Sequence, residues 1–348
     1  MSRRWILLGL CLLMLTPHGI AKATVLRVLA WPGYVSPAVL AAFEHHHQVE
    51  VELTTIDSDD TLWEKIRNPA SPYDVFAVNT AELQRYIAAG LVQPIDPEKI
   101  PRLDEQNAAF RTPAAIPGLI HHGQLFAVPY TYAAMGLIYD PAQWPTPPRS
   151  IRALWDPHYQ GKVLVYDGGT HNFTLAAQSL DLPDPFQLGE QDWRPVVDRL
   201  IALRRNVLTF YQTPEQSVRL FQRHHIALML ANYGSQQMRL MAEAGVKAGF
   251  TLPEEGALTW LDTWAIARRS THPTLAHAWI NAMLSAESAH ALQDTQGLAS
   301  TRALPAEWQP ARIRWLKPVE NPARRAALWQ RIESGDQPDK LQTQVNAP

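Results

Sequence analysis

The sequence predicts an α/β protein of two lobes, each a sheet flanked by helices with a ligand cleft between them. Strand-like and helix-like segments alternate over residues 24–90, a second alternating block begins near Gly136, and about 325 residues follow an amino-terminal leader. Such alternation is typical of a parallel sheet with helices on both faces, and this length favours two domains over one. Clefts between domains are frequent sites for small ligands.

The leader is expected to be a secretory signal peptide, Met1–Ala23. Arginines precede an apolar run from about Trp5 to Leu15, and Ala21-Lys22-Ala23 supplies a cleavage pattern of small residues. The alternative to a cleaved signal peptide is a permanent membrane anchor, but the apolar run is too short for one. Cleavage would remove Cys11, the only cysteine, so the exported chain would contain no disulfide.

The first block is justified by local patterns. The segment QVEVELT alternates apolar and polar residues as a half-buried strand does. Ser36-Pro37 is a helix-start signal before apolar residues at helical spacing, and Gly90 ends the last helix. The patterns predict strands over 24–30, 48–54 and 73–78, and helices over 37–47, 60–66 and 81–89.

The second block follows the same logic with longer gaps. Buried strands are expected over 162–166 and 226–230, and helices over 170–180, 193–204 and 275–284. Proline-rich segments at 141–149 and 304–318 are expected to be connections. The polar tail after Gly335 is expected to fray.

Charge and motifs exclude several classes of function. Without the leader the chain has 28 basic and 33 acidic residues, a net charge of −5, which does not favour nucleic acid as a partner. No nucleotide-binding, nucleophile-elbow or metal-ligand motif occurs, so neither a cofactor nor a metal is expected. Three adjacent histidines, His45–His47, cannot converge on one ion from a helix. An enzyme is therefore the weaker hypothesis.

One carboxylate stands out. The segment LTWLDTWAI places Asp262 in a run otherwise suited to burial, and a buried carboxylate without a partner is costly. Trp260 lies two residues before it. The two alternatives are a ligand site for a cation and a packing role in which Asp262 is only a cap.

An ordered set of motifs resembles the periplasmic spermidine/putrescine-binding proteins of ABC importers. The set consists of AWPGYV at 30–35, YDVFAVNT at 73–80, VPY at 128–130, LWDPHYQGK at 154–162, TWLD at 259–262 and QG at 296–297. The resemblance runs from about residue 26 to about 305. It implies a two-lobed type II periplasmic binding fold whose chain crosses between the lobes more than once.

The resemblance also implies boundaries and a site. Lobe 1 would comprise residues 24–134 and 262–306, and lobe 2 residues 135–261 and 307–340, after a signal peptide over 1–23 and before a frayed tail over 341–348. Asp262 would bind an ammonium group, beside an aromatic box of Trp31, Tyr34 and Trp260. The full set of candidate ligand-binding residues is Trp31, Tyr34, Asn79, Asp167, His171, Tyr233, Trp260 and Asp262.

The sequence departs from the family pattern at the turn after the lobe-two strand. Gly168 replaces an aspartate and His171 replaces an acid, while Asp167 is kept. A long polyamine would then leave one ammonium poorly compensated. Glu254 and Glu255 could replace the lost acids, although solvent-facing positions are preferred for both. A histidine in the cleft would also introduce a pH dependence near pH 6.5.

We therefore expect a periplasmic solute-binding protein, a monomer without enzymatic activity, that captures a small amine of the spermidine and putrescine class. It would present the ligand to an inner-membrane ABC permease. Alternatives are a sensor that signals to a membrane cyclic-di-GMP enzyme, a binder of an amino-acid-like ligand whose anionic end meets the Gly168-Gly169 turn, and a periplasmic α/β hydrolase.

Overall fold

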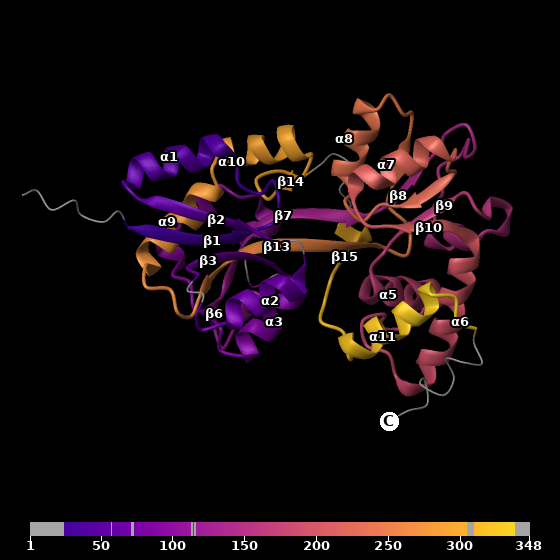
Figure 1. The fold of residues 1–348 in the computed structure, drawn as a ribbon, viewed down its shortest axis with the longest axis horizontal. Helices are drawn as coiled ribbons and strands as arrows, with labels where there is room; N and C mark the ends of the chain where they lie inside the picture. Colours follow the sequence, from indigo (N-terminus) through magenta and orange to yellow (C-terminus); the bar gives the residue numbers. More distant parts are fainter. Residues whose placement is uncertain are drawn as a thin grey trace, which may run out of the picture.

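The computed structural model describes residues 24–337, apart from residues 57, 71–72, 113, 115 and 305–309. The chain forms two lobes joined by long strands (Figure 1). The signal peptide expected over Met1–Ala23 and the tail expected over 341–348 lie outside the described residues. Within the described part, no helix has the length and hydropathy needed to cross a membrane.

Lobe 1 contains a mixed sheet with the strand order β14-β7-β13-β3-β1-β2, and β4 and β15 also pair with β13. Strands β1, β2 and β3 are parallel, as the alternation predicts. Strand β13 is antiparallel to both β3 and β7, because it returns from the other lobe. The strands are β1 (Val25–Ala30), β2 (Glu50–Thr55), β3 (Val75–Asn79), β4 (Val92–Gln93), β7 (Ala127–Met135), β13 (Ala257–Ala267), β14 (Ala299–Ser300) and β15 (Ile313–Trp315).

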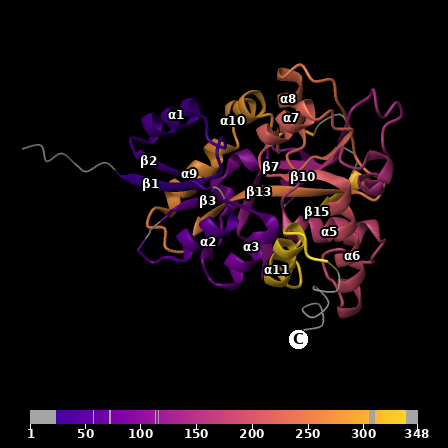
Figure 2. The same ribbon diagram turned by 45° about the vertical axis from the view of Figure 1, so that its right-hand side comes forward.

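Helices cover both faces of this sheet (Figures 1 and 2). On one face α1 packs on α9 through Phe43 and Trp279, whose ring centroids lie 5.0 Å apart. On the other face α2 packs on α3 through Trp63 and Tyr86, also 5.0 Å apart. The helices are α1 (Pro37–His47), α2 (Asp59–Arg67), α3 (Thr80–Ala88), α4 (Ala108–Arg111), α9 (Pro273–Met283) and α10 (Ala286–Ala291), followed by the π-helical segment η6 (Leu292–Gln296); a small hairpin pairs β5 (Ile120–His121) with β6 (Gln124–Leu125).

Lobe 2 contains a smaller sheet with the order β10-β9-β11-β8-β12. Strand β9 is parallel to β10 and β11, whereas β8 is antiparallel to its neighbours. Its elements are β8 (Leu137–Tyr139), β9 (Val163–Tyr166), β10 (Val207–Tyr211), β11 (Leu228–Leu230), β12 (Gly249–Thr251), α5 (Gly169–Ser179), α6 (Glu190–Asn206), α7 (Pro214–Arg223), α8 (Ser235–Glu243) and α11 (Pro322–Glu333).

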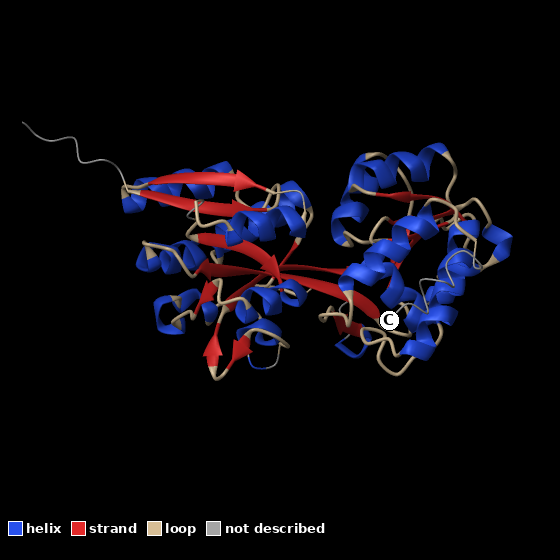
Figure 3. Ribbon diagram, turned by 60° about the horizontal axis from the view of Figure 1, so that its bottom comes forward, coloured by secondary structure: helices blue, strands red, loops and turns tan. Residues whose placement is uncertain are grey.

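Strands β7 and β13 form the main connection between the lobes (Figure 3). They pair in the antiparallel sense from Leu258 opposite Met135 to Ala265 opposite Ala127, with a shift of register between Asp262 and Thr263. Met135 and Leu258 belong to a hydrophobic core of lobe 2, whereas Ala127 and Ala265 belong to the core of lobe 1. Each strand therefore passes from one core to the other without a loop.

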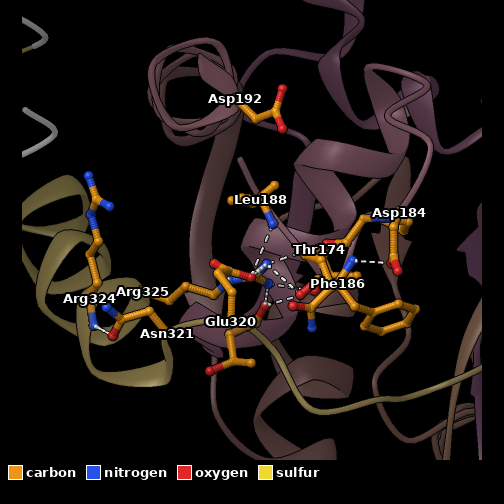
Figure 4. A network of polar contacts seen from close by, with 12 residues as sticks. Thr174, Asp184, Phe186, Leu188, Asp192, Glu320, Asn321, Arg324 and Arg325 are labelled. Atoms are coloured by element: carbon orange, nitrogen blue, oxygen red, sulfur yellow. Dashed lines mark hydrogen bonds and ion pairs between the residues drawn. The ribbon is translucent and has the colours of Figure 1, made fainter. Parts of the chain in front are cut away.

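The carboxyl-terminal helix α11 is fixed to lobe 2 by a buried ion pair. Arg325 is fully buried and donates to both carboxylate oxygens of Glu320, at 3.0 and 2.8 Å. Its other amino group donates to the Thr170 carbonyl and the Thr174 hydroxyl of α5. Figure 4 shows this network around Arg325 and Glu320. The first turn of α5 is thereby held against α11.

The strands and helices predicted from local patterns are confirmed, with ends that differ by at most three residues. The segment 304–318, expected to be only a connection, also contains β15, which pairs with the lobe-two end of β13. Local signals such as caps are visible in the sequence, whereas this pairing depends on the position of a distant strand.

Candidate functional site

The candidate site lies where the carboxyl ends of three parallel strands meet at one edge of the lobe 1 sheet, a position typical of ligand sites in α/β folds. Trp31 and Tyr34 follow β1, Asp59 follows β2, and Asn79 ends β3. In the neighbouring strand β13, Asp262 is paired with Asn79.

Asp262 is a buried carboxyl without an ion pair among the described residues, and it is only 7% exposed. The phenol of Tyr34, which is itself 6% exposed, donates a hydrogen bond to its Oδ2. Burial raises the pKa of Asp262 to about 7, and the bond from Tyr34 only partly opposes this effect. Tyr34 is fixed in turn by Tyr130, whose hydroxyl donates to the Tyr34 carbonyl at 2.5 Å. The carboxyl is therefore rigidly placed and lacks a positive partner.

A second carboxyl, Asp59, lies close to Asn79. The Asn79 amide nitrogen is 3.5 Å from Asp59 Oδ1, while the Asn79 oxygen caps α3 by accepting from the Glu82 amide. Burial, followed by the charges of Glu82 and Asp262, raises the pKa of Asp59 to about 7, against the opposing charge of Arg85. Asn79 thus connects the two acidic residues.

The aromatic residues predicted near the ligand are held by different parts of the structure. Trp31 is half-buried against the lobe 1 core, and its indole nitrogen is buried without a hydrogen-bond partner among the described residues. Trp260, which shares a face of β13 with Asp262, packs on the cores of both lobes and donates to the carbonyl of Asn232 in lobe 2. Tyr233 donates to Gln212 and meets the ring of Tyr166 edge-on, with centroids 5.7 Å apart.

A cavity of about 460 Å³ opens between the lobes next to these residues. Its lobe 1 wall includes Asp59, Asn79 and the ion pair of Glu82 with Arg85, which measures 2.7 Å. Its lobe 2 wall and floor are formed by Tyr166, Gly168, Gly169, Thr170, His171, Thr174, Phe186, residues 316–319 and Pro322. Of the eight predicted site residues, Asn79 and His171 line this cavity. Trp31, Tyr34, Trp260 and Asp262 are not part of its lining.

The polar residues predicted in lobe 2 are placed differently from one another. The carboxylate of Asp167 accepts from the Trp329 indole at 2.8 Å and from the Gln212 amide at 3.2 Å, and it is not part of the cavity lining. His171 does line the cavity, but burial and the nearby charge of Arg325 lower its pKa to about 4. With this lowered pKa, we expect the ring to stay neutral from pH 5.5 to 8 and not to show the pH dependence near 6.5 that the sequence suggests.

The described residues do not support Glu254 or Glu255 as replacements for the acids lost from the lobe 2 turn. Glu255 accepts from the Ile151 amide at 3.1 Å and from Ser150, and Glu254 forms a long contact with the exposed Arg149. Neither glutamate lines the cavity. Within the described ranges, no three His, Cys, Asp or Glu side chains are grouped as metal ligands.

Residues 38–310 match the family model for bacterial extracellular solute-binding proteins. The chain is a member of this family. The predicted solute-binding function is thereby confirmed. A curated relative of this solute-binding protein is the spermidine/putrescine-binding periplasmic protein 1 of Haemophilus influenzae, 24% identical over 300 residues that cover 82% of this chain and 81% of the relative.

Solved structures confirm the type II periplasmic binding fold for this solute-binding protein. The spermidine/putrescine ABC transporter substrate-binding protein PotD of Streptococcus pneumoniae superimposes with a TM-score of 0.73 and 20% identity, covering 90% of this chain and 99% of PotD. A structure titled Atu4243-GABA receptor gives a TM-score of 0.70 with 13% identity, covering 90% and 99% of the two chains.

Most residues that line the cavity of this solute-binding protein were missed by sequence reasoning, and Asp59 and Tyr166 are among them. Asp59 is the first residue of α2, after the Ser58 cap, where an acidic residue is ordinarily explained by the helix dipole. The signal that could have found it is its place after β2, because the ends of parallel strands share one edge. Tyr166 could have been found in the same way, because it is the last residue of β9.

Proposed function

We propose that this protein captures a small amine-bearing ligand of the polyamine class between its lobes and presents it to an inner-membrane ABC permease. The observation that carries the proposal is Asp262, a carboxyl 7% exposed whose only side-chain partner among the described residues is the neutral phenol of Tyr34. A ligand ammonium would supply the missing positive charge.

The energetics favour such a ligand. A hydrogen bond between a charged donor and a carboxylate contributes about 1.5–3 kcal/mol. An ammonium over the face of Trp31 or Trp260 would gain a further ~0.5–2 kcal/mol through cation–π attraction. Binding would also relieve the cost of ionising Asp262 in its buried position.

An amino-acid-like ligand is the second candidate. The Gly168–His171 turn carries no acid, and α5 begins there without a side-chain cap. Free amides at a helix start favour an anion, which would suit the carboxylate of a ligand whose amine meets Asp262. The name of the structural neighbour called a GABA receptor is consistent with this candidate.

Location and partner follow from the same proposal. The relative from Haemophilus is named as periplasmic and PotD as an ABC transporter protein, which supports a periplasmic location and a permease partner for this chain. We propose in addition that the leader is cleaved after Ala23 and that the mature protein is a monomer. Among the described residues, the cavity lining includes His171 but no serine or cysteine, so it does not offer the serine–histidine or cysteine–histidine pair that would favour the hydrolase alternative.

Isothermal calorimetry on the refolded, ligand-free mature chain tests the proposal. Putrescine, spermidine and norspermidine are titrated in turn, followed by γ-aminobutyrate. We expect micromolar binding of at least one amine, weakened about 100-fold or more in Asp262→Asn because a buried charge loses its partner. Binding of γ-aminobutyrate alone would select the second candidate. Amine affinity that Asp262→Asn leaves intact would overturn the assigned site.

A further inference from the structure

The two walls of the cavity differ in charge. On the lobe 1 side, Glu82 is neutralised by Arg85, which also donates to the backbone carbonyl of Asp59 at 3.0 Å. The Asp59 side chain has no ion pair among the described residues, and its hydrogen-bond contact with Asn79 is long, at 3.5 Å. The facing turn over 168–171 offers no carboxylate. The lining also contains Lys317, which forms no ion pair with Asp59 among the described residues. Asp59 is therefore the acid of the lining without an ion-pair partner, and it lies on lobe 1.

Asp59 and Asp262 lie on either side of Asn79. Asn79 pairs with Asp262 in the ladder between β3 and β13, and its side-chain amide reaches Asp59. The charge of Asp262 contributes to the raised pKa of Asp59, after burial and Glu82. The charge of Asp59 also contributes to the raised pKa of the Tyr166 phenol across the cleft. Burial and the charge of Asp167 raise this pKa more, and the hydrogen bond with Tyr233 lowers it. The position of Asp59 therefore extends the Asp262 site into the cavity.

We propose that Asp59 is a second ammonium-binding carboxyl and that the ligand is a short diamine held at both ends by lobe 1. One ammonium would meet Asp262 and the other Asp59, with Tyr166 closing over the chain from lobe 2. This arrangement accounts for a lobe 2 turn without acids, since no ligand charge needs a partner there. The inference rests on the proposed amine-binding function and adds the residue that selects short diamines.

The test compares two ligands that differ in one charge. Putrescine carries two ammonium groups, and 4-aminobutan-1-ol has a hydroxyl in place of one of them. Calorimetry is performed on the refolded mature chain and on Asp59→Asn, Asp262→Asn and Asp60→Asn. Asp60 is the matched control because it is the next residue of α2 and its side chain is exposed.

We expect wild-type protein to bind putrescine at least about tenfold more tightly than the amino alcohol. Asp59→Asn should weaken putrescine binding by about tenfold or more and change the affinity for the amino alcohol less than about threefold. Asp262→Asn should weaken both ligands, and Asp60→Asn neither. Spermidine, whose third charge would extend beyond the two carboxyls, should bind more weakly than putrescine.

Several results would overturn the inference. Equal effects of Asp59→Asn and Asp60→Asn on putrescine would remove Asp59 from the site while leaving the proposed function intact. Equal affinity of the wild type for putrescine and 4-aminobutan-1-ol would also remove Asp59 from the site, because the second ammonium would then contribute nothing to binding. If circular dichroism shows that Asp59→Asn is misfolded, Asp59→Ser replaces it, since serine is also favoured near helix starts. Failure of the wild type to bind any amine would refute the proposed function and this inference together.

Discussion

Asp262 combines burial with a raised pKa, so its ionisation should destabilise the ligand-free protein. Its pKa is about 7 in the folded chain against an ordinary value of 3.8. The folded state therefore holds the proton more tightly, and stability falls as the pH rises from about 4 through 7. Asp262→Asn removes this penalty while keeping an acceptor for Tyr34. We expect the variant to be about 1–3 kcal/mol more stable than wild type at pH 8, with a difference that shrinks as the pH falls and is nearly gone at about pH 4.

Urea unfolding at the two pH values measures this difference. Asp60→Asn is the control, since an exposed charge should change the free energy of unfolding by less than about 0.5 kcal/mol. A variant less stable than wild type at pH 8 would mean that Asp262 forms a stabilising interaction in the ligand-free protein.

His171 should remain neutral over the whole physiological range. Burial and Arg325 lower its pKa to about 4, so its imidazole C2 proton should not shift in NMR spectra between pH 5.5 and 8. Free histidine added to the sample titrates near 6.5 and serves as the standard. A His171→Gln variant assigns the signal. A midpoint near 6.5 for that signal would restore the pH dependence that the sequence alone suggested.

Among single residues, those identified by a motif were the easier ones to predict. Asp262 and Tyr34 come from separate motifs and form a hydrogen bond in the structure. Asp167 also follows a strand, but its contacts with Trp329 and Gln212 are made inside lobe 2. The local sequence around Asp59 indicates only the start of a helix. The role of an acid therefore depends on neighbours brought near it by folding, which the sequence does not reveal.

At the scale of elements, α11 depends on its buried arginine. Arg325→Ala would leave Glu320 without its ion-pair partner and remove the hydrogen bonds to Thr170 and Thr174. Breaking a buried pair in this way costs about 3–5 kcal/mol. The control Arg149→Ala removes an ion contact whose arginine side chain is 76% exposed and should cost less than about 1 kcal/mol.

Guanidinium unfolding followed by circular dichroism compares the two variants. Similar losses for Arg325→Ala and Arg149→Ala would show that α11 is held mainly by its apolar contacts. Because Arg325 also holds the first turn of α5, which lines the cavity, we expect Arg325→Ala to weaken ligand binding as well.

The elements themselves were largely predictable because their signals are local. Ser36 caps α1 as the sequence suggests, by accepting from the amide three residues on, and Ser58 caps α2 in the same way. The direction and central place of β13 were not predictable, since they depend on pairing with strands some 130 and 180 residues earlier in the chain. The mixed character of the sheet follows from that pairing.

For the molecule as a whole, a contact between α8 of lobe 2 and the segment around Gly297 of lobe 1 joins the two lobes directly. The Ser235 hydroxyl donates to the Gly297 carbonyl at 2.7 Å, and Arg239 donates to the Asp294 carbonyl at 3.0 Å. A Cβ atom at Gly297 would already lie 3.0 Å from Cα of Gln236. A larger side chain at this position should hold the lobes apart.

Gly297→Leu should therefore increase the radius of gyration in small-angle scattering and weaken ligand binding about three- to tenfold, since the closed state becomes less populated. Gly90→Leu is a matched control. Both glycines have φ of +66°, but nothing lies within 4 Å of a Cβ at Gly90. Both variants carry the same backbone strain, so equal binding by the two would show that the α8 contact does not govern closure.

The position of β13 also has a consequence for how the protein is made. This strand lies between β3 and β7 in the sheet, yet it begins only at Ala257, after almost all of lobe 2. A nascent chain that ends before Ala257 has β3 and β7 but no strand to join them, so lobe 1 cannot complete its sheet during most of synthesis. Long-range pairing of this kind slows folding. For a protein that we propose to be exported, slow folding would keep the chain extended until it has crossed the inner membrane.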